Sequence, residues 1–300
     1  MHFRRLVIAA SAAFFLFGSI DASARTLVLG SVSNNIKKHL ARFQPLVEYL
    51  QAELSADGIT DIQIAVLPSS DAMADALRDK RVDIFFDSPL VAAKVARSSD
   101  SEPFLRRWKH GIGSYHSLIM VRAESDIHTI EDLAGKRIAF QAPDSTSGFM
   151  LPAGMLRRKG MTLRELPSRA ARPDDNEVGY IFTKDDKNTL AWFYKGWVDA
   201  AATDPESYED LARIKPGAFR VIARSIEVPR QVVVRRRGVD PALAARIEAV
   251  LTAMEGTEHG RDVMQHFSMT TRFDRFPDGV DATFDPIYQL LDQLEAEGVI

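Results

Sequence analysis

The feature that most constrains the fold is a repeated alternation of short apolar runs with segments of helical spacing. Residues 26–31, 62–67 and 82–86 are rich in aliphatic and β-branched side chains, which is typical of buried strands. Residues 37–54 and 71–78 lie between them and place apolar side chains about 3.6 residues apart. Strands that alternate with helices need crossover connections. The pattern therefore predicts an α/β fold with a mainly parallel sheet, which binds ligands at the carboxyl ends of its strands.

The same alternation begins again near residue 129 and predicts a second lobe inserted into the first. The later expected elements are helices at 90–96, 129–133, 187–194, 241–254 and 284–294, a helix that begins at Ser145, and strands at 115–121, 136–140, 178–182, 198–202, 221–226 and 231–235. We expect 25–122 and 231–300 to form lobe 1 and 123–230 to form lobe 2, joined by two crossing strands. A cleft between two α/β lobes is a common place for a small ligand.

Residues 1–24 have the pattern of a cleavable signal peptide. Two arginines precede an apolar stretch, and Ala22, Ser23 and Ala24 provide a small-residue cleavage site. The stretch is shorter than the ~20 apolar residues of a membrane-spanning helix, which argues against an anchor. The chain has no cysteine, so disulfides, thiolate metal sites and cysteine nucleophiles are excluded. Export without disulfides predicts a periplasmic location.

A cluster of hydroxyl residues after the expected strand at 136–140 carries the main functional signal. Ser145 is a favourable N-cap, and the first N–H groups of a helix lack partners and carry partial positive charge. Thr146 and Ser147 add further hydroxyl groups, while Gly148 has no side chain to keep a ligand from the backbone. This arrangement suits a tetrahedral oxyanion, although a cluster that only caps a helix is the alternative. Pro152 lacks the N–H that would bond to residue 148, so we expect the helix to bend or tighten.

The segment 132–140, followed by 144–152, resembles the phosphate/phosphite/phosphonate-binding family of ABC-transporter periplasmic receptors. Further similarity lies at Gly30, 82–84, 113–115 and 196–199. The resemblance implies a two-lobed type II periplasmic binding protein fold with a ligand cleft between the lobes. It also implies that the hydroxyl cluster holds the oxyanion and that Tyr115 is a pocket tyrosine. A strand aromatic packed into the core is the alternative for Tyr115.

Several positions depart from the family pattern. Ser70 stands where the family has a second pocket tyrosine, and Asp186 stands where it has an anion-binding histidine. Arg230 replaces an acidic residue of binders that recognise an amino group, whereas Glu206, with Asp204 nearby, keeps an upstream acidic counterpart. The expected ligand-binding residues are Ser145, Thr146, Ser147, Gly148, Tyr115, Ser70, Asp186, Glu206 and Arg230.

Two of these departures suggest how the ligand is selected. A carboxylate beside a dianion is unfavourable unless the ligand carries a proton that the carboxylate can accept. We therefore expect Asp186 to favour a protonated oxyanion over sulfate, unless it only caps the helix at 187–194. Arg230 restores positive charge and can bind two oxygen atoms, unless it points to solvent. The small Ser70 leaves room for a bulkier ligand.

The expected function is capture of a phosphorus oxyanion, namely phosphonate, phosphite or phosphate, and delivery to an ABC permease. Ligand contacts with both lobes would favour the closed state. A receptor that signals to a membrane sensor kinase is the alternative, and a monomer is expected. No enzyme, metal site or cofactor is expected, because the sequence has no metal-ligand spacing, nucleotide-binding loop or catalytic constellation. The net charge of −3 gives no indication of nucleic acid binding.

Overall fold

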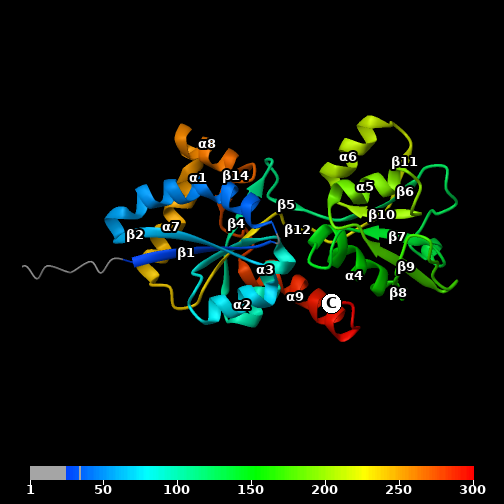
Figure 1. Ribbon diagram of the computed structural model, residues 1–300, viewed down its shortest axis with the longest axis horizontal. Coiled ribbons are helices and arrows are strands. Elements are labelled where there is room, and N and C mark those ends of the chain that lie inside the picture. The colour runs from blue at the N-terminus through cyan, green and yellow to red at the C-terminus, as the bar shows by residue number, and fades with distance from the viewer. Residues whose placement is uncertain (1–24, 34) are drawn as a thin grey trace, which may run out of the picture.

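The computed structural model describes residues 25–33 and 35–300. Two lobes lie side by side and are joined by a narrow waist (Figure 1). Each lobe is built on a six-stranded sheet with helices on both faces. The signal peptide expected at 1–24 lies outside the described residues. Within the described ranges, we find no helix whose length and apolar character would allow it to cross a membrane.

The sheet of the first lobe has the strand order β14-β4-β13-β3-β1-β2. Its strands are β1 (Arg25–Val32), β2 (Ile59–Leu67), β3 (Ile84–Asp87), β4 (Glu102–Lys109), β13 (Val232–Arg235) and β14 (Thr270–Asp274). β1 runs parallel to β2 and β3, as the alternation predicts, whereas β13 is antiparallel to both β3 and β4. The sheet is therefore mixed rather than mainly parallel. The reason is that β4 leads towards the waist and β13 returns from it.

Helices of the first lobe cover the two faces of this sheet. They are α1 (Ile36–Leu54), α2 (Ser70–Arg78), α3 (Pro89–Ser99), α7 (Pro241–Ala253), α8 (Glu258–His266) and α9 (Val280–Ala296), with short 3₁₀ turns η1 (Ser55–Asp57) and η4 (Met254–Gly256). α1, α7 and α8 pack on one face, and α2, α3 and α9 on the other. In α1 the periodic residues Phe43, Leu46, Leu50 and Leu54 are buried. Each such side chain stabilises the fold by about 1.5–3 kcal/mol.

The second lobe has the strand order β11-β6-β10-β7-β9-β8. Its strands are β6 (Leu118–Arg122), β7 (Arg137–Phe140), β8 (Thr162–Glu165), β9 (Glu177–Phe182), β10 (Ala200–Thr203) and β11 (Phe219–Arg224). Its helical elements are η2 (Glu131–Leu133), η3 (Thr146–Met150), α4 (Leu151–Arg158), α5 (Asp186–Tyr194) and α6 (Pro205–Ile214). β7 runs parallel to β9 and β10, whereas β6 is antiparallel to β10 and β11. This sheet is mixed as well.

Two short strands form the waist. β5 (Ser114–Tyr115) pairs antiparallel with β12 (Val228–Pro229), so both crossing segments meet there. The single strand expected over 115–121 is thus divided into β5 and β6. β6 belongs to the second sheet, so we place the start of lobe 2 before Leu118 instead of after residue 122.

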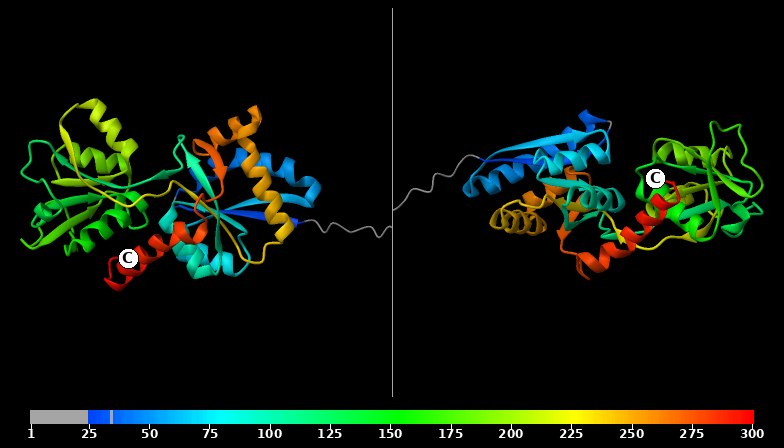
Figure 2. Two further views of the ribbon diagram at one scale, coloured as in Figure 1. Left: turned by 180° about the vertical axis from the view of Figure 1, so that it is seen from behind. Right: turned by 90° about the horizontal axis from the view of Figure 1, so that it is seen from below.

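Helix α9 forms a further connection beneath the waist (Figure 2). It packs against α3 of the first lobe and α4 of the second, within one hydrophobic cluster that is continuous across the lobes. Arg157 of α4 binds Glu297 at 2.5 Å, just after α9. Arg97 of α3 binds Glu295 at 2.7 Å. The two lobes therefore share packed contacts around α9.

Candidate ligand-binding site

The hydroxyl cluster begins a helix, as the sequence predicts. Ser145 is the N-cap: its Oγ accepts a hydrogen bond from the Gly148 N–H at 3.0 Å and donates one to Gln141 Oε1 at 2.6 Å. The first turn, η3, is π-helical, so the helix widens before Pro152 and does not tighten. Because Pro152 has no N–H, the Gly148 carbonyl is free to accept from the Gln141 N–H at 3.0 Å.

Gly148 is needed for packing. A Cβ at this position would lie 2.6 Å from Gln141 Cβ and 2.7 Å from Ser145 Oγ. The space beside Gly148 is thus filled by protein, and the missing side chain does not leave the backbone open to a ligand. The glycine instead allows Gln141 to hold the N-cap serine in place.

Thr146, Ser147 and Tyr115 come together at the waist. Thr146 is buried, and its Oγ1 accepts a hydrogen bond at 3.3 Å from the Leu90 N–H at the start of α3. The carbonyl of Ser147 accepts a hydrogen bond from Ser117 Oγ at 2.6 Å. Burial raises the pKa of Tyr115 to about 12, although the charge of Arg230 and the nearby side chains of Ser147 and Thr146 oppose the shift. The Tyr115 hydroxyl therefore stays protonated at neutral pH and can donate to an anion.

Arg230 is buried in the waist beside this group. Its guanidinium carbon lies 4.5 Å from the centroid of the Tyr115 ring, and its backbone N–H donates to the Gly113 carbonyl at 2.9 Å. The side chain therefore packs on Tyr115 and does not point to solvent. A stacked guanidinium of this kind is held in one orientation, with N–H groups available for oxyanion oxygens.

Acidic side chains lie at the ends of the second-lobe strands. Asp185, and not Asp186, caps α5: its Oδ1 accepts from the Asn188 N–H at 2.8 Å. Asp204 caps α6 by accepting from the Ser207 N–H at 3.0 Å. The pKa of Asp186 is raised, first because the surrounding protein limits its hydration and then because Asp204 is nearby. The alternative that Asp186 is only a cap is therefore wrong.

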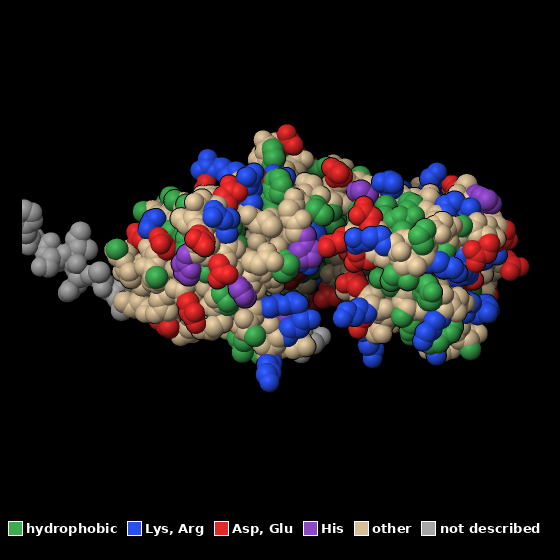
Figure 3. Space-filling view, turned by 90° about the horizontal axis from the view of Figure 1, so that it is seen from above, with side chains coloured by type: hydrophobic (Ala, Val, Ile, Leu, Met, Phe, Trp, Pro, Cys, Tyr) green, Lys and Arg blue, Asp and Glu red, His purple; other side chains and the backbone are tan. Residues whose placement is uncertain are grey.

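Glu206 contacts His110 across the cleft. His110 and Gly111 form the tip of the hairpin after β4, with φ angles of 54° and 78°. Two residues with positive φ are characteristic of a type I′ turn, which projects its tip away from the sheet. The space-filling view shows the hollow between the lobes, with acidic side chains along its second-lobe rim (Figure 3). In this conformation Glu206 serves as a contact between the lobes.

The first-lobe wall of the cleft is basic, and the sequence patterns did not predict it. Arg107 and Lys109 lie at the end of β4, and Arg42 lies on α1. Burial, followed by the charge of Arg230, lowers the pKa of Arg107 to about 9 and that of Lys109 to about 8. The basic run 106–109 was the available signal, but it belongs to a strand that we did not predict.

Asp87 is the carboxyl group that faces this basic wall. It ends β3, and its Oδ1 accepts a hydrogen bond from the Ser88 N–H at 2.7 Å. Burial raises the pKa of Asp87 to about 7, and the charge of Asp144 acts in the same direction. Near neutral pH this carboxyl group therefore carries only part of a negative charge.

Ser70 lies apart from these groups. It lines a separate cavity of about 280 Å³ together with Phe149, Tyr180 and the C-terminal Ile300. That cavity shares no lining residue with the cavity in the basic wall, which has a volume of about 380 Å³. In the residues that the structure describes, no cluster of three or more His, Asp or Glu side chains could hold a metal ion.

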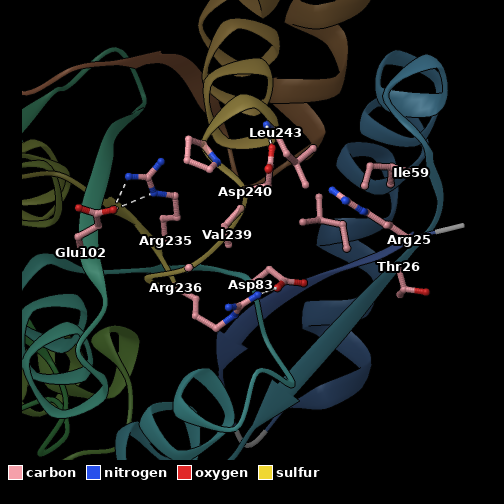
Figure 4. A pocket seen from close by; sticks show the side chains of 13 residues that line it. Arg25, Thr26, Ile59, Asp83, Glu102, Arg235, Arg236, Val239, Asp240 and Leu243 are labelled. Atoms are coloured by element: carbon pink, nitrogen blue, oxygen red, sulfur yellow. Dashed lines mark hydrogen bonds and ion pairs between the residues drawn. The ribbon is translucent and has the colours of Figure 1, made fainter. Parts of the chain in front are cut away.

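A larger cavity, of about 770 Å³, lies at the other end of the first sheet, beside the start of β1 (Figure 4). Two arginines in this cavity are already paired. Arg235 donates to Glu102 at 3.0 Å, and Arg236 donates to Asp83 at 2.7 Å. Because these charges are compensated within the protein, this cavity is a weaker candidate for an anion site than the cleft.

Two mixed α/β lobes with a cleft at their waist define the class of type II periplasmic binding proteins. Residues 30–278 match the family described as the periplasmic substrate-binding protein of phosphonate ABC transporters. The chain therefore belongs to this family, whose members bind a small ligand in the periplasm and act with an ABC permease.

Individual relatives agree with this assignment. The phosphate-import protein PhnD of Mycolicibacterium smegmatis is 22% identical over 236 residues, which are 75% of this chain and 70% of the relative. XAC2383 of Xanthomonas citri, solved with chloride and with ATP, is 28% and 27% identical, respectively, with a TM-score of 0.81 and coverage of 91% of this chain and 98% of that chain. PhnD1 of Prochlorococcus marinus with methylphosphonate is 15% identical and shares the fold, with a TM-score of 0.66 over 90% of this chain and 98% of that chain.

Proposed function

We propose that this protein captures a phosphonate, phosphite or phosphate between its lobes and delivers it, as a monomer, to an ABC permease. The observation that carries the proposal is the cluster of Tyr115, Ser147 and Arg230 at the waist. These residues bring hydroxyl and guanidinium donors close together. Tetrahedral oxyanions accept hydrogen bonds in several directions, so they suit such a set.

The backbone at the start of η3 supports the same ligand class. Among the described residues, no group accepts a hydrogen bond from the N–H of Thr146 or Ser147. These N–H groups lie at a helix N-terminus, where partial positive charge favours an anion. The relative XAC2383 was solved with ATP and with chloride, and both are anions. This supports an anionic ligand for the present chain too.

Closure provides the mechanism. A ligand that contacts η3 of the second lobe together with Tyr115 and Arg230 at the waist has more partners when the lobes approach. Only such a difference in binding free energy between the open and closed states shifts their populations. Delivery to a permease and signalling to a sensor kinase would share this first step, and the permease is favoured by the family.

A thermal melt of the purified protein with a panel of anions tests the proposal. The panel contains phosphate, phosphite, methylphosphonate, aminoethylphosphonate and sulfate at equal concentrations. A ligand at about 1,000 times its dissociation constant adds roughly 4 kcal/mol to stability. We expect at least one phosphorus compound to raise the Tm by several degrees more than sulfate does. No shift with any phosphorus compound would contradict the proposal.

A further inference from the structure

The cavity of about 380 Å³ in the first-lobe wall has its own concentration of positive charge. It lies at the carboxyl ends of β1, β3 and β4, the edge at which such sheets bind ligands. Its titratable lining residues are His39, Arg42, Asp87, Arg107, Lys109 and His110. The volume falls within the range of small-molecule sites and exceeds what one oxyanion needs.

Arg107 is the most unusual member of this lining. Its side chain is buried, with 6% of its surface exposed. The guanidinium donates to two neutral groups, Thr270 Oγ1 at 2.9 Å and Gln231 Oε1 at 2.6 Å, and its Nε is buried without a partner. A buried guanidinium that donates only to neutral groups has no ion-pair partner among the described residues, and the one carboxyl group in the cavity that acts on it, Asp87, is only partly ionised near neutral pH.

A neighbouring arginine, in contrast to Arg107, has a carboxylate partner. Arg106, the neighbour of Arg107 in β4, binds Asp274 through two nitrogens, at 2.9 and 2.7 Å. By contrast, no described carboxylate forms an ion pair with Arg42, Arg107 or Lys109. The cavity therefore gathers three cations, and the described carboxyl groups that act on them, Asp87, Asp204 and Glu206, form no ion pair with them. A bound anion would relieve their mutual repulsion.

Residues of the cavity also interact electrostatically with the proposed ligand site. Arg230, which packs on Tyr115, lowers the pKa of both Arg107 and Lys109 through its charge. Lys109 is in turn within electrostatic reach of Glu206 of the second lobe. Arg230 thus belongs to the waist cluster and lies within electrostatic reach of the basic cavity, so a ligand with two anionic groups can contact both.

We propose that this cavity is a second anion subsite, which binds the second phosphate-type group of a ligand whose first phosphorus oxyanion lies at Tyr115 and Ser147. The proposal rests on the function proposed above and narrows the ligand class to compounds with two phosphorus oxyanion groups, such as diphosphates and bisphosphonates. One such group matches the donors at the waist. The second compensates the cations of Arg42, Arg107 and Lys109.

Isothermal titration calorimetry with methylphosphonate and methylenediphosphonate, at one salt concentration, tests the proposal. We expect the wild-type protein to bind methylenediphosphonate at least about tenfold more tightly than methylphosphonate. Lys109→Gln should weaken methylenediphosphonate binding by about tenfold and change methylphosphonate binding by less than about twofold. Arg42→Gln is a second, independent variant with the same expected pattern. Lys80→Gln is the matched control, because Lys80 is exposed and precedes β3, at the end remote from the cleft.

The outcomes separate this proposal from the proposed function. Equal affinities of the wild-type protein for the two ligands, equal losses for both in Lys109→Gln, or a similar loss in Lys80→Gln would overturn the second subsite and leave the cleft function intact. Ser147→Ala should weaken both ligands. A further outcome is that Ser147→Ala changes the affinity for neither ligand while methylenediphosphonate binding still depends on Lys109. In that case the proposed function is wrong, and so is the proposal that the ligand carries two phosphorus oxyanion groups.

Discussion

The two walls of the cleft differ in chemistry although both are built from strand ends of similar sheets. The first-lobe wall presents Arg107 and Lys109 with little counter-charge. The second-lobe wall presents hydroxyl groups at η3 and the carboxyl groups of Asp186 and Asp204. The hydroxyl wall is satisfied largely by the protein itself, because Ser145 and Thr146 already have partners. The cations of the basic wall have no ion-pair partner in the described part of the protein. We therefore expect contacts with this wall to contribute most to the free energy of anion binding.

This difference also assigns distinct roles to the two lobes. Uncompensated cations attract anions over distances beyond contact, and in a cleft they raise the local anion concentration. Hydroxyl groups act only at hydrogen-bonding distance, and carboxyl groups repel fully ionised anions, so the second-lobe wall distinguishes one anion from another. We therefore expect the first lobe to supply affinity for charge and the second to supply discrimination among oxyanions.

Ser147→Ala is expected to have the largest effect. Loss of a hydroxyl that meets a charged oxygen should weaken oxyanion binding by about 1.5–3 kcal/mol. Calorimetry with methylphosphonate measures the change. Ser168→Ala, an exposed serine of the same lobe, is the control and should leave binding unchanged. Unchanged affinity in Ser147→Ala would remove this wall from the site.

Asp87→Asn tests the basic wall through pH. The folded pKa of Asp87 is raised to about 7 by burial, so the native state binds more protons than the unfolded state between about pH 4 and 7. This group therefore makes the wild-type protein less stable as pH rises through that window, by on the order of 4 kcal/mol. Urea unfolding at pH 5 and pH 8 should show a smaller difference in Asp87→Asn. The exposed Asp281→Asn should retain the wild-type difference, and identical pH profiles of all three proteins would refute this assignment.

Asp186→Asn tests discrimination by the second wall. The substitution removes the carboxyl group that would accept a proton from the ligand and repel a fully ionised anion. We expect the preference for phosphate over sulfate to fall by about tenfold, or ~1.4 kcal/mol. Competition calorimetry measures the ratio. The exposed Asp175→Asn serves as control, and unchanged selectivity in Asp186→Asn would exclude this role.

Asp185→Ala should have the smallest effect and act on stability alone. Loss of the N-cap of α5 is expected to cost about 1 kcal/mol of unfolding free energy and to leave oxyanion affinity unchanged. Urea unfolding and calorimetry on the same samples measure both quantities. Asp186→Ala is the matched comparison and should show the reverse pattern. A larger stability loss in Asp186→Ala than in Asp185→Ala would reverse the roles that we assign to these neighbours.

The sequence predicted the features that depend on local patterns. The buried strands, the amphipathic α1 and the N-cap at Ser145 follow from spacing and capping preferences, and the resemblance supplied the two-lobed class. The basic wall was missed because β4 does not show a simple apolar pattern. Its inward positions include Leu105 but also Arg107, and its partners β13 and β14 are far away in sequence.

Other errors arose where neighbouring residues compete for one role. Asp185 and Asp186 are both acceptable caps, and only the backbone of Asp185 has the extended conformation of an N-cap. The widened turn before Pro152 depends on a hydrogen bond from Gln141, which lies in the preceding loop. Neither outcome is encoded in composition or periodicity. The strands β8 and β14 and the helices α6 and α8 were also missed, because they are short and lie at lobe surfaces.

Small-angle X-ray scattering with and without saturating methylenediphosphonate tests the central claim most directly. If one ligand contacts both walls, the lobes should approach each other, and the radius of gyration should fall. Ser147→Ala at the same ligand concentration should show less compaction. A scattering profile of the wild-type protein that does not change, although calorimetry detects binding, would show that the ligand occupies one lobe only and would contradict the account.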